Sequence, residues 1–180
     1  MEEKKLLELA KKEGFAAALL PTDQIPVDYR FRAYCEENRC GRYGANYSCP
    51  PDCGTPEEMH RRILSEPWAL VLASRWDIDG YEDHDGIRRA KEGHNAAARR
   101  LLKAMEHLGC TGFVVGCSGC QLCSPCKLVS GEPCPFPDQR ISCMSAYCVD
   151  VSALSKKCGL EFAWTDRQLY LYGMIAFQPV

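Results

Sequence analysis

The residues best suited to chemistry in this sequence are its cysteines, and the most informative run lies in the second half of the chain. It reads Cys117-Ser-Gly-Cys-Gln-Leu-Cys-Ser-Pro-Cys126, and a further cysteine stands before a proline at Cys134. A C-x2-C-x2-C run brings three thiolates from one tight loop to one face of an inorganic cube, and a fourth ligand arrives from elsewhere. The run therefore predicts a 4Fe-4S cluster held by Cys120, Cys123, Cys126 and Cys134.

Two alternatives stay open for this loop. The triplet Cys117, Cys120 and Cys123 obeys the same spacing rule, and the later triplet is preferred because a short loop connects it to Cys134. Structural zinc also takes four thiolates, but it favours two C-x2-C pairs joined by a longer spacer over a triple run.

A second set of cysteines lies nearer the N-terminus, with the spacing C-x4-C-x8-C-x3-C. Glycines interrupt this segment and Pro50-Pro51 stiffens it, so it can wrap around one inorganic cofactor. The spacing matches no short motif with a unique interpretation, and both an iron-sulfur cluster and zinc fit it. The predicted ligands are Cys35, Cys40, Cys49 and Cys53.

Five cysteines remain, and the simplest interpretation is that they are small buried hydrophobic residues. They are Cys110, Cys117, Cys143, Cys148 and Cys158. Cys143 and Cys148 also lie close enough to Cys134 in sequence to serve a third centre, so these two and Cys117 are additional candidate ligands.

The other charged and titratable residues give weaker signals. The histidines are expected on solvated helix faces rather than at a metal; they are His60, His84, His94 and His107. Several basic residues flank the cysteines and either offset the negative charge of a thiolate-bound 4Fe-4S core or are ordinary solvated charges. They are Arg32, Arg39, Arg42, Lys127 and Arg140.

Composition limits the classes of protein to which the chain can belong. Its 180 residues include 13 cysteines, 46% hydrophobic and 26% charged residues, which are values for a globular protein of one domain. The net charge is −2, from 22 basic and 24 acidic residues, so nucleic acid and anionic membranes are not expected as partners. The charged N-terminus lacks the apolar segment of a secretion signal. We therefore expect a cytoplasmic protein, whose cysteines bind metal rather than form disulfides.

Helices and strands that alternate along the sequence must position the cysteine loops. Helices are predicted at residues 2–12, 56–65, 84–108 and 150–157, and strands at 15–20, 68–76, 111–116 and 169–177. This order predicts an α/β or α+β fold. We expect a single layered domain over residues 1–180, with a mixed sheet, flanking helices and metal-binding loops at about 35–53 and 117–148.

The motifs together resemble one known family, the predicted metal-binding proteins of domain of unknown function 2284. The resemblance rests on Cys35 to the Cys49-Pro-Pro turn, on the Cys120 to Cys126 run, on Pro133-Cys134, and on Ala146-Tyr147 with Asp150-Val151. It implies a small cytosolic metal or iron-sulfur protein of bacteria and archaea, many of them anaerobes. It also implies Ser and Gly where this chain has Cys143 and Cys148, and it assigns no ligand role to Cys53.

Three functions compete at this point. The first is electron transfer through two 4Fe-4S clusters, in anaerobic metabolism, to a redox partner protein. The second is a reductase or sulfur-handling enzyme, in which Cys35, Cys40 and Cys49 hold a cluster whose fourth iron is open to a small-molecule substrate. The third is a zinc-binding protein. No catalytic acid or base stands out, and Gly41-Arg-Tyr-Gly44 lacks the lysine of a phosphate-binding loop.

Overall fold

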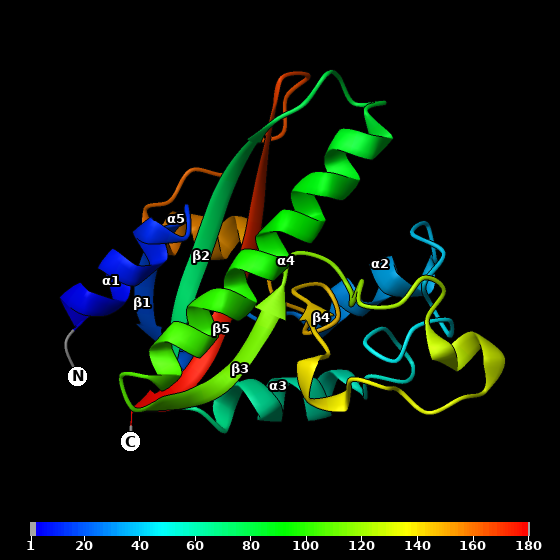
Figure 1. The fold of residues 1–180 in the computed structure, drawn as a ribbon, viewed down its shortest axis with the longest axis horizontal. Coiled ribbons are helices and arrows are strands. Elements are labelled where there is room, and N and C mark those ends of the chain that lie inside the picture. The colour runs from blue at the N-terminus through cyan, green and yellow to red at the C-terminus, as the bar shows by residue number, and fades with distance from the viewer. Residues whose placement is uncertain (1–2, 180) are drawn as a thin grey trace.

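A five-stranded mixed sheet runs through the protein, and helices cover both of its faces (Figure 1). The computed structural model describes residues 3–179. The strands stand in the order β1-β2-β5-β3-β4, and every neighbouring pair is antiparallel except β3 and β4, which are parallel. Their bounds are β1 (Ala16–Pro21), β2 (Trp68–Asp77), β3 (Cys110–Gly116), β4 (Ser142–Cys143) and β5 (Gln168–Pro179).

The helices begin and end at local sequence signals. Thr55 starts one of them with a capping box, because its hydroxyl accepts from the Glu58 N–H (3.2 Å) while the Glu58 carboxylate accepts from the Thr55 N–H (2.8 Å). Asp83 and Asp150 cap two others by accepting backbone N–H bonds. The α-helices are α1 (Glu3–Lys12), α2 (Arg32–Glu36), α3 (Pro56–Leu64), α4 (His84–Glu106) and α5 (Val151–Cys158).

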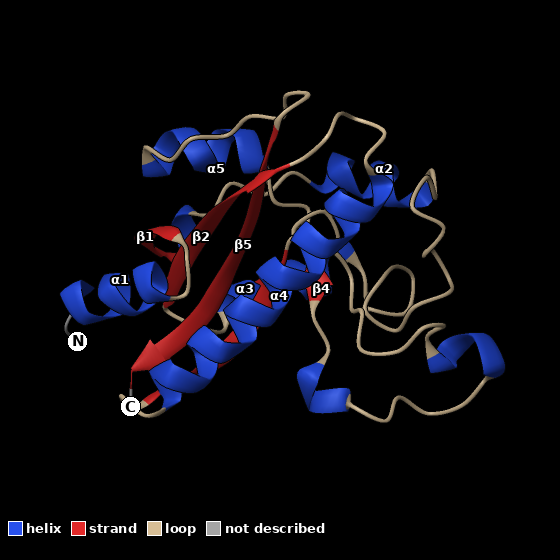
Figure 2. Ribbon diagram, turned by 45° about the horizontal axis from the view of Figure 1, so that its top comes forward, coloured by secondary structure: helices blue, strands red, loops and turns tan. Residues whose placement is uncertain are grey.

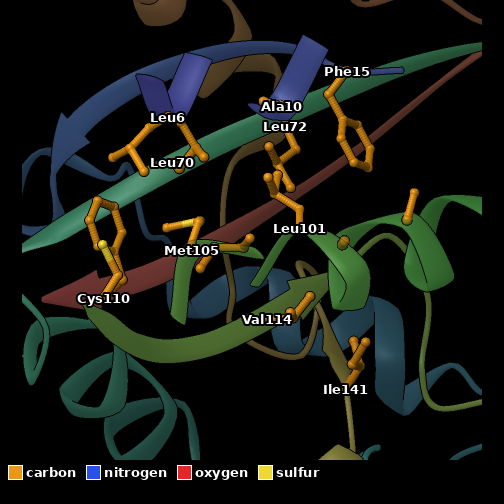
Figure 3. Close-up of a cluster of buried hydrophobic side chains, with 14 residues drawn as sticks. Leu6, Ala10, Phe15, Leu70, Leu72, Leu101, Met105, Cys110, Val114 and Ile141 are labelled. Carbon is orange, nitrogen blue, oxygen red and sulfur yellow. The ribbon is translucent and has the colours of Figure 1, made fainter. Parts of the chain in front are cut away.

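Alternation along the strands builds a core on each face of the sheet. Leu70 and Leu72 of β2 face α1 and α4, where they pack against residues such as Leu6 and Leu101 (Figure 3). The intervening Val71 faces the other way, toward the cluster that contains residues of α3 and α5. The long central strands therefore form a rigid layer to which the cysteine loops are attached.

The cysteine-rich loops gather at one side of this layer. Figures 1 and 2 both show the chain after α2 and the chain after β3 on the side of the sheet away from the two termini. The parallel pairing of β3 with β4 contributes to this arrangement, because it aligns Gly116 with Cys143 and makes both strands end at the same edge. Two segments that are distant in sequence thus reach the same place.

The structure confirms the predicted mixed class of helices and strands. All eight predicted elements are present, with ends within two residues of the prediction among the residues that the structure describes. The predicted start of the first helix, Glu2, lies outside the described residues, as do residues 1 and 180 of the predicted domain. The sequence did not predict α2 or β4. No helix in the described part of the chain is long and apolar enough to cross a membrane.

Candidate metal centres

The C-terminal cysteine group, as we call Cys120, Cys123, Cys126 and Cys134, lies in the loop between β3 and β4. All four side chains are half-buried and line one small cavity, together with Asn46 and Tyr47 of the N-terminal half. The pKa of the Cys123 thiol is raised, first by burial and then by the negative charges of the other three thiolates. The structure thus brings together the four ligands that the sequence predicts for this centre.

Asn95 of α4 fixes the start of this loop. Its side chain is fully buried, and its amide oxygen accepts a hydrogen bond from the Cys117 N–H (3.1 Å). Its amide nitrogen donates to the Ser118 carbonyl (3.2 Å) and to the Gln121 side chain (3.3 Å). These bonds take the place of the strand-pairing hydrogen bonds, which end with β3 at Gly116, so the loop leaves the sheet in a defined direction.

The N-terminal half of the chain holds the other side of the same loop. The Ser48 hydroxyl accepts from the Cys120 N–H (2.8 Å), and Asn46 and Arg42 both donate to the Cys120 carbonyl (3.0 and 2.8 Å). Gly119 lets the two segments approach closely, because a Cβ at that position would stand 2.7 Å from the Cys49 sulfur. The loops that carry the two sets of cysteines are therefore packed directly against each other.

The N-terminal cysteine group, Cys35, Cys40, Cys49 and Cys53, is divided by the structure. Cys35, Cys40 and Cys49 line a cleft of about 480 Å³. Cys53 instead lines a neighbouring cavity with Arg62 and Phe113, and its sulfur lies 3.9 Å from the Gly54 carbonyl oxygen. Two other cysteines, Cys117 and Cys143, line the cleft with the first three.

The thiols around this cleft differ in their acidity. The side chains of Cys35 and Cys143 lie in the same cleft, and their interaction raises the pKa of Cys35 and lowers the pKa of Cys143. Backbone N–H groups of Ala146 and Ser145 also lower the pKa of Cys143. Burial raises the pKa of Cys49 and of Cys117 to about 12, and that of Cys53 to about 11. Among Cys35, Cys49, Cys117 and Cys143, only Cys143 has a lowered pKa.

Two arginines that lie near the cysteines form no ion pair with a carboxylate of the described residues. Arg32 is 7% exposed, and its guanidinium donates to the carbonyls of Gly54 and Ala146 (both 2.9 Å). Arg99 has a buried terminal nitrogen without a hydrogen-bond partner; burial lowers the pKa of its guanidinium, and the thiolate charge of Cys120 opposes that shift. Among the described residues, neither arginine has an acidic side chain within ion-pair distance. Arg39 and Lys127, by contrast, form exposed pairs with Glu37 (2.7 Å) and Glu132 (3.2 Å), as solvated charges do.

The expectation that the histidines lie on solvated faces is wrong for His94. Its ring is fully buried between α4 and the sheet, in edge contact with Phe15. The Trp76 indole donates to the Ser74 hydroxyl, and that hydroxyl is also hydrogen-bonded to Nδ1 of His94 (both 2.7 Å). The error arose because the helix that contains His94 is rich in charged residues, although its own position faces the core.

Several positioning residues carried no signal in the sequence. Asn95, Ser48 and Arg99 are single polar residues in ordinary segments, and only the fold brings them to the cysteines. Within residues 3–179, no group of three or more His, Cys, Asp or Glu side chains is placed to hold one metal ion.

Comparison with known proteins gives one match. Residues 18–177 match the model of a family described as predicted metal-binding protein (DUF2284). The match spans both cysteine groups and supports metal binding, without indicating which metal. No curated protein and no solved structure matches the chain.

Proposed function

Because the chain belongs to the DUF2284 family of predicted metal-binding proteins, we propose that it binds two 4Fe-4S clusters and transfers electrons through them to a redox partner protein. The C-terminal cysteine group holds one cluster. Cys35, Cys40 and Cys49 hold the other with a fourth ligand, for which the sequence predicts Cys53. A 4Fe-4S cluster bound to thiolates accepts and releases single electrons.

The donor atoms available at both places fit such clusters. The side chains of the C-terminal cavity that can ligate a metal are four thiols, and the cleft is lined by five thiols and a single histidine, His84. Soft thiolate ligands select iron-sulfur clusters, zinc or copper(I) over metals that prefer oxygen. The triple C-x2-C-x2-C run favours iron-sulfur over zinc within that set.

The local charges also fit an anionic group. Burial of a guanidinium without a counter-charge is costly. Arg32 is buried, Arg99 is half-buried with one buried terminal nitrogen, and both lack a carboxylate among the described residues. The positive charge of Arg32 favours the thiolate form of Cys35. The negative charge of a Cys120 thiolate likewise favours the charged form of Arg99. A cluster ligated by four thiolates carries net negative charge, which would compensate one arginine at each centre.

The contact between the two cysteine groups is the observation that carries the electron-transfer proposal. The Ser48 hydroxyl is hydrogen-bonded to the backbone of Cys120 and lies 3.9 Å from the Cys49 sulfur. Gly119 of the other loop lies near the same sulfur, because a Cβ added at Gly119 would stand 2.7 Å from it. Ligands of the two centres are thus separated by one side chain and one peptide unit, which is the proximity that an electron needs to pass between them.

Purification without oxygen, followed by iron and sulfide analysis, tests this proposal. We expect a brown protein with about eight irons and eight sulfides per chain, and a reduced-state electron paramagnetic resonance (EPR) spectrum broadened by coupling between two clusters. A colourless protein that contains zinc and no sulfide would refute it.

The cleft favours a second candidate function, a reductase or sulfur-handling enzyme. Its volume of about 480 Å³ is large enough for a small molecule to reach Cys35, Cys40 and Cys49. If those three cysteines were the whole ligand set, one iron would be open to that molecule. Addition of cyanide or sulfide to the reduced protein distinguishes the two functions: a changed EPR spectrum supports the open-iron enzyme, and an unchanged one supports the electron carrier.

A further inference from the structure

We infer that Cys143 is the fourth ligand of the N-terminal centre, with Cys35, Cys40 and Cys49, and that Cys53 lies outside that centre. This inference rests on the proposed function, because it assigns one ligand of a cluster proposed there. It deepens that proposal by closing the coordination of the N-terminal cluster, as an electron carrier requires.

The first argument is the position of the Cys143 sulfur. Cys143 lines the same cleft as Cys35, Cys40 and Cys49. Four thiols therefore face one space, three from the segment predicted in sequence and one from β4. Cys53 is absent from the residues that line this cleft and faces the cavity beside Arg62 and Phe113.

The second argument is that the backbone holds Cys143 in a fixed position. Cys143 pairs with Gly116 in the parallel β3–β4 ladder. The Met144 N–H donates to the Gly116 carbonyl (3.0 Å), and the Tyr147 N–H donates to the Cys143 carbonyl (3.2 Å). A ligand held on both sides by hydrogen bonds loses little conformational freedom when it binds a metal, so this sulfur is preorganised.

The remaining cysteine of the cleft, Cys117, is engaged elsewhere. Its thiol donates to the Asn95 side-chain oxygen (3.5 Å) and to the Lys91 carbonyl (3.6 Å). Both contacts need the protonated thiol, because a thiolate would meet two oxygen acceptors. Cys117 therefore fits a structural role, which leaves Cys143 as the fourth cysteine of the cleft.

The test compares Cys143→Ser with Cys53→Ser in protein purified without oxygen. We expect Cys143→Ser to lose or alter one of two clusters, with a fall of up to about four irons per chain and loss of the coupled EPR signal. Cys53→Ser is the matched control, since it removes a nearby half-buried sulfur, and we expect it to keep the iron content and spectrum of the wild type.

Chemical rescue separates ligation from folding. Cys143→Ala leaves space at the cleft, and ethanethiol supplied during cluster reconstitution can provide the missing sulfur. Recovery of the wild-type iron content and spectrum is expected with ethanethiol and not with ethanol, whereas a purely structural defect would not respond to the thiol.

The outcomes distinguish this inference from the proposed function. A wild-type protein with zinc or without two clusters refutes the proposed function, and the inference with it. A wild-type protein with two clusters whose iron content and EPR spectrum are both unchanged in Cys143→Ser refutes the inference alone. Equal iron loss in Cys143→Ser and Cys53→Ser, or absence of rescue by ethanethiol, would also overturn it.

Discussion

The Ser48 hydroxyl accepts a hydrogen bond of 2.8 Å from the Cys120 N–H and lies 3.9 Å from the Cys49 sulfur. Ser48 is itself buried, at 1% exposure, and its hydroxyl donates to the Asn46 side chain (2.8 Å). One small side chain therefore contacts a candidate ligand from each cysteine group. A substitution of Ser48 should therefore affect both candidate centres.

The substitution Ser48→Ala tests that relationship. It leaves the buried Cys120 N–H without its acceptor, which should lower the free energy of unfolding by about 1–3 kcal/mol. We also expect a changed EPR spectrum of the reduced protein, because the C-terminal loop loses its contact with Cys49. Urea unfolding without oxygen measures the first effect. Ser130→Ala, which removes an exposed hydroxyl of the same loop, should change stability by less than about 0.5 kcal/mol.

Replacement of the C-terminal ligands should unfold their loop locally. Few apolar side chains of residues 117–137 are buried, so we expect Cys120→Ala, Cys123→Ala, Cys126→Ala or Cys134→Ala each to remove about one cluster's iron and make the loop sensitive to protease. Iron analysis and limited proteolysis measure the two effects. Cys158→Ala, at a half-buried cysteine of α5, should keep both clusters. Full iron and full thermal stability in all four variants would exclude this ligand set.

The sequence predicted the sheet and its long helices because those elements obey local rules. The capping box at Thr55, the apolar run of β2 and the glycine after α5 are signals carried by a few adjacent residues. The four C-terminal cysteines are equally local, and the structure brings them to one cavity. Their role as cluster ligands stays a prediction.

The rest of the site depends on contacts between distant segments. The meeting of Cys35 with Cys143 requires the short strand β4, which has two residues and no periodic pattern to reveal it. Asn95 and Ser48 gain their roles only when α4 and the N-terminal loop pack against the chain after β3. No spacing rule connects such positions, so the sequence alone could not place them.

Arg32 should raise the reduction potential of the N-terminal centre. Its buried positive charge lies near Cys35 and Cys53 and stabilises any added negative charge. Arg32→Met removes the charge at similar length, and we expect the potential to fall by on the order of 60 mV, a tenfold change in a one-electron equilibrium. Redox titration followed by EPR measures this shift. Arg39→Met, at an exposed arginine paired with Glu37, should leave the potential unchanged; equal shifts in both variants would contradict the role of Arg32.

His94 should make the fold sensitive to acid. Burial lowers the pKa of His94 to about 3, below its ordinary value of 6.5, so the unfolded chain binds a proton there that the folded protein does not. The folded state is therefore favoured fully above about pH 6.5, and the advantage is lost as the pH falls toward 3. At pH 5.5 the loss should be about 1.4 kcal/mol.

Urea unfolding at pH 7.5 and pH 5.5 measures this loss in the wild type and in His94→Gln, which does not titrate. The wild type should lose more stability than His94→Gln between the two pH values. His84→Gln, at an exposed histidine, should behave as the wild type does. If His94→Gln and the wild type lose the same amount, His94 is not the acid-sensitive group.

The position of Cys35 and Cys143 in one cleft also determines the order in which the cysteines of that cleft are synthesised. The two residues stand 108 positions apart (143 minus 35), whereas Cys120 to Cys134 span only 15 positions (134 minus 120, plus 1). A ribosome delivers the N-terminal residues first, so Cys35, Cys40 and Cys49 emerge long before their neighbour in β4 exists. During synthesis these early thiols emerge without Cys143, and the first proposed set of four cysteines to be complete is the later one, in the loop after β3.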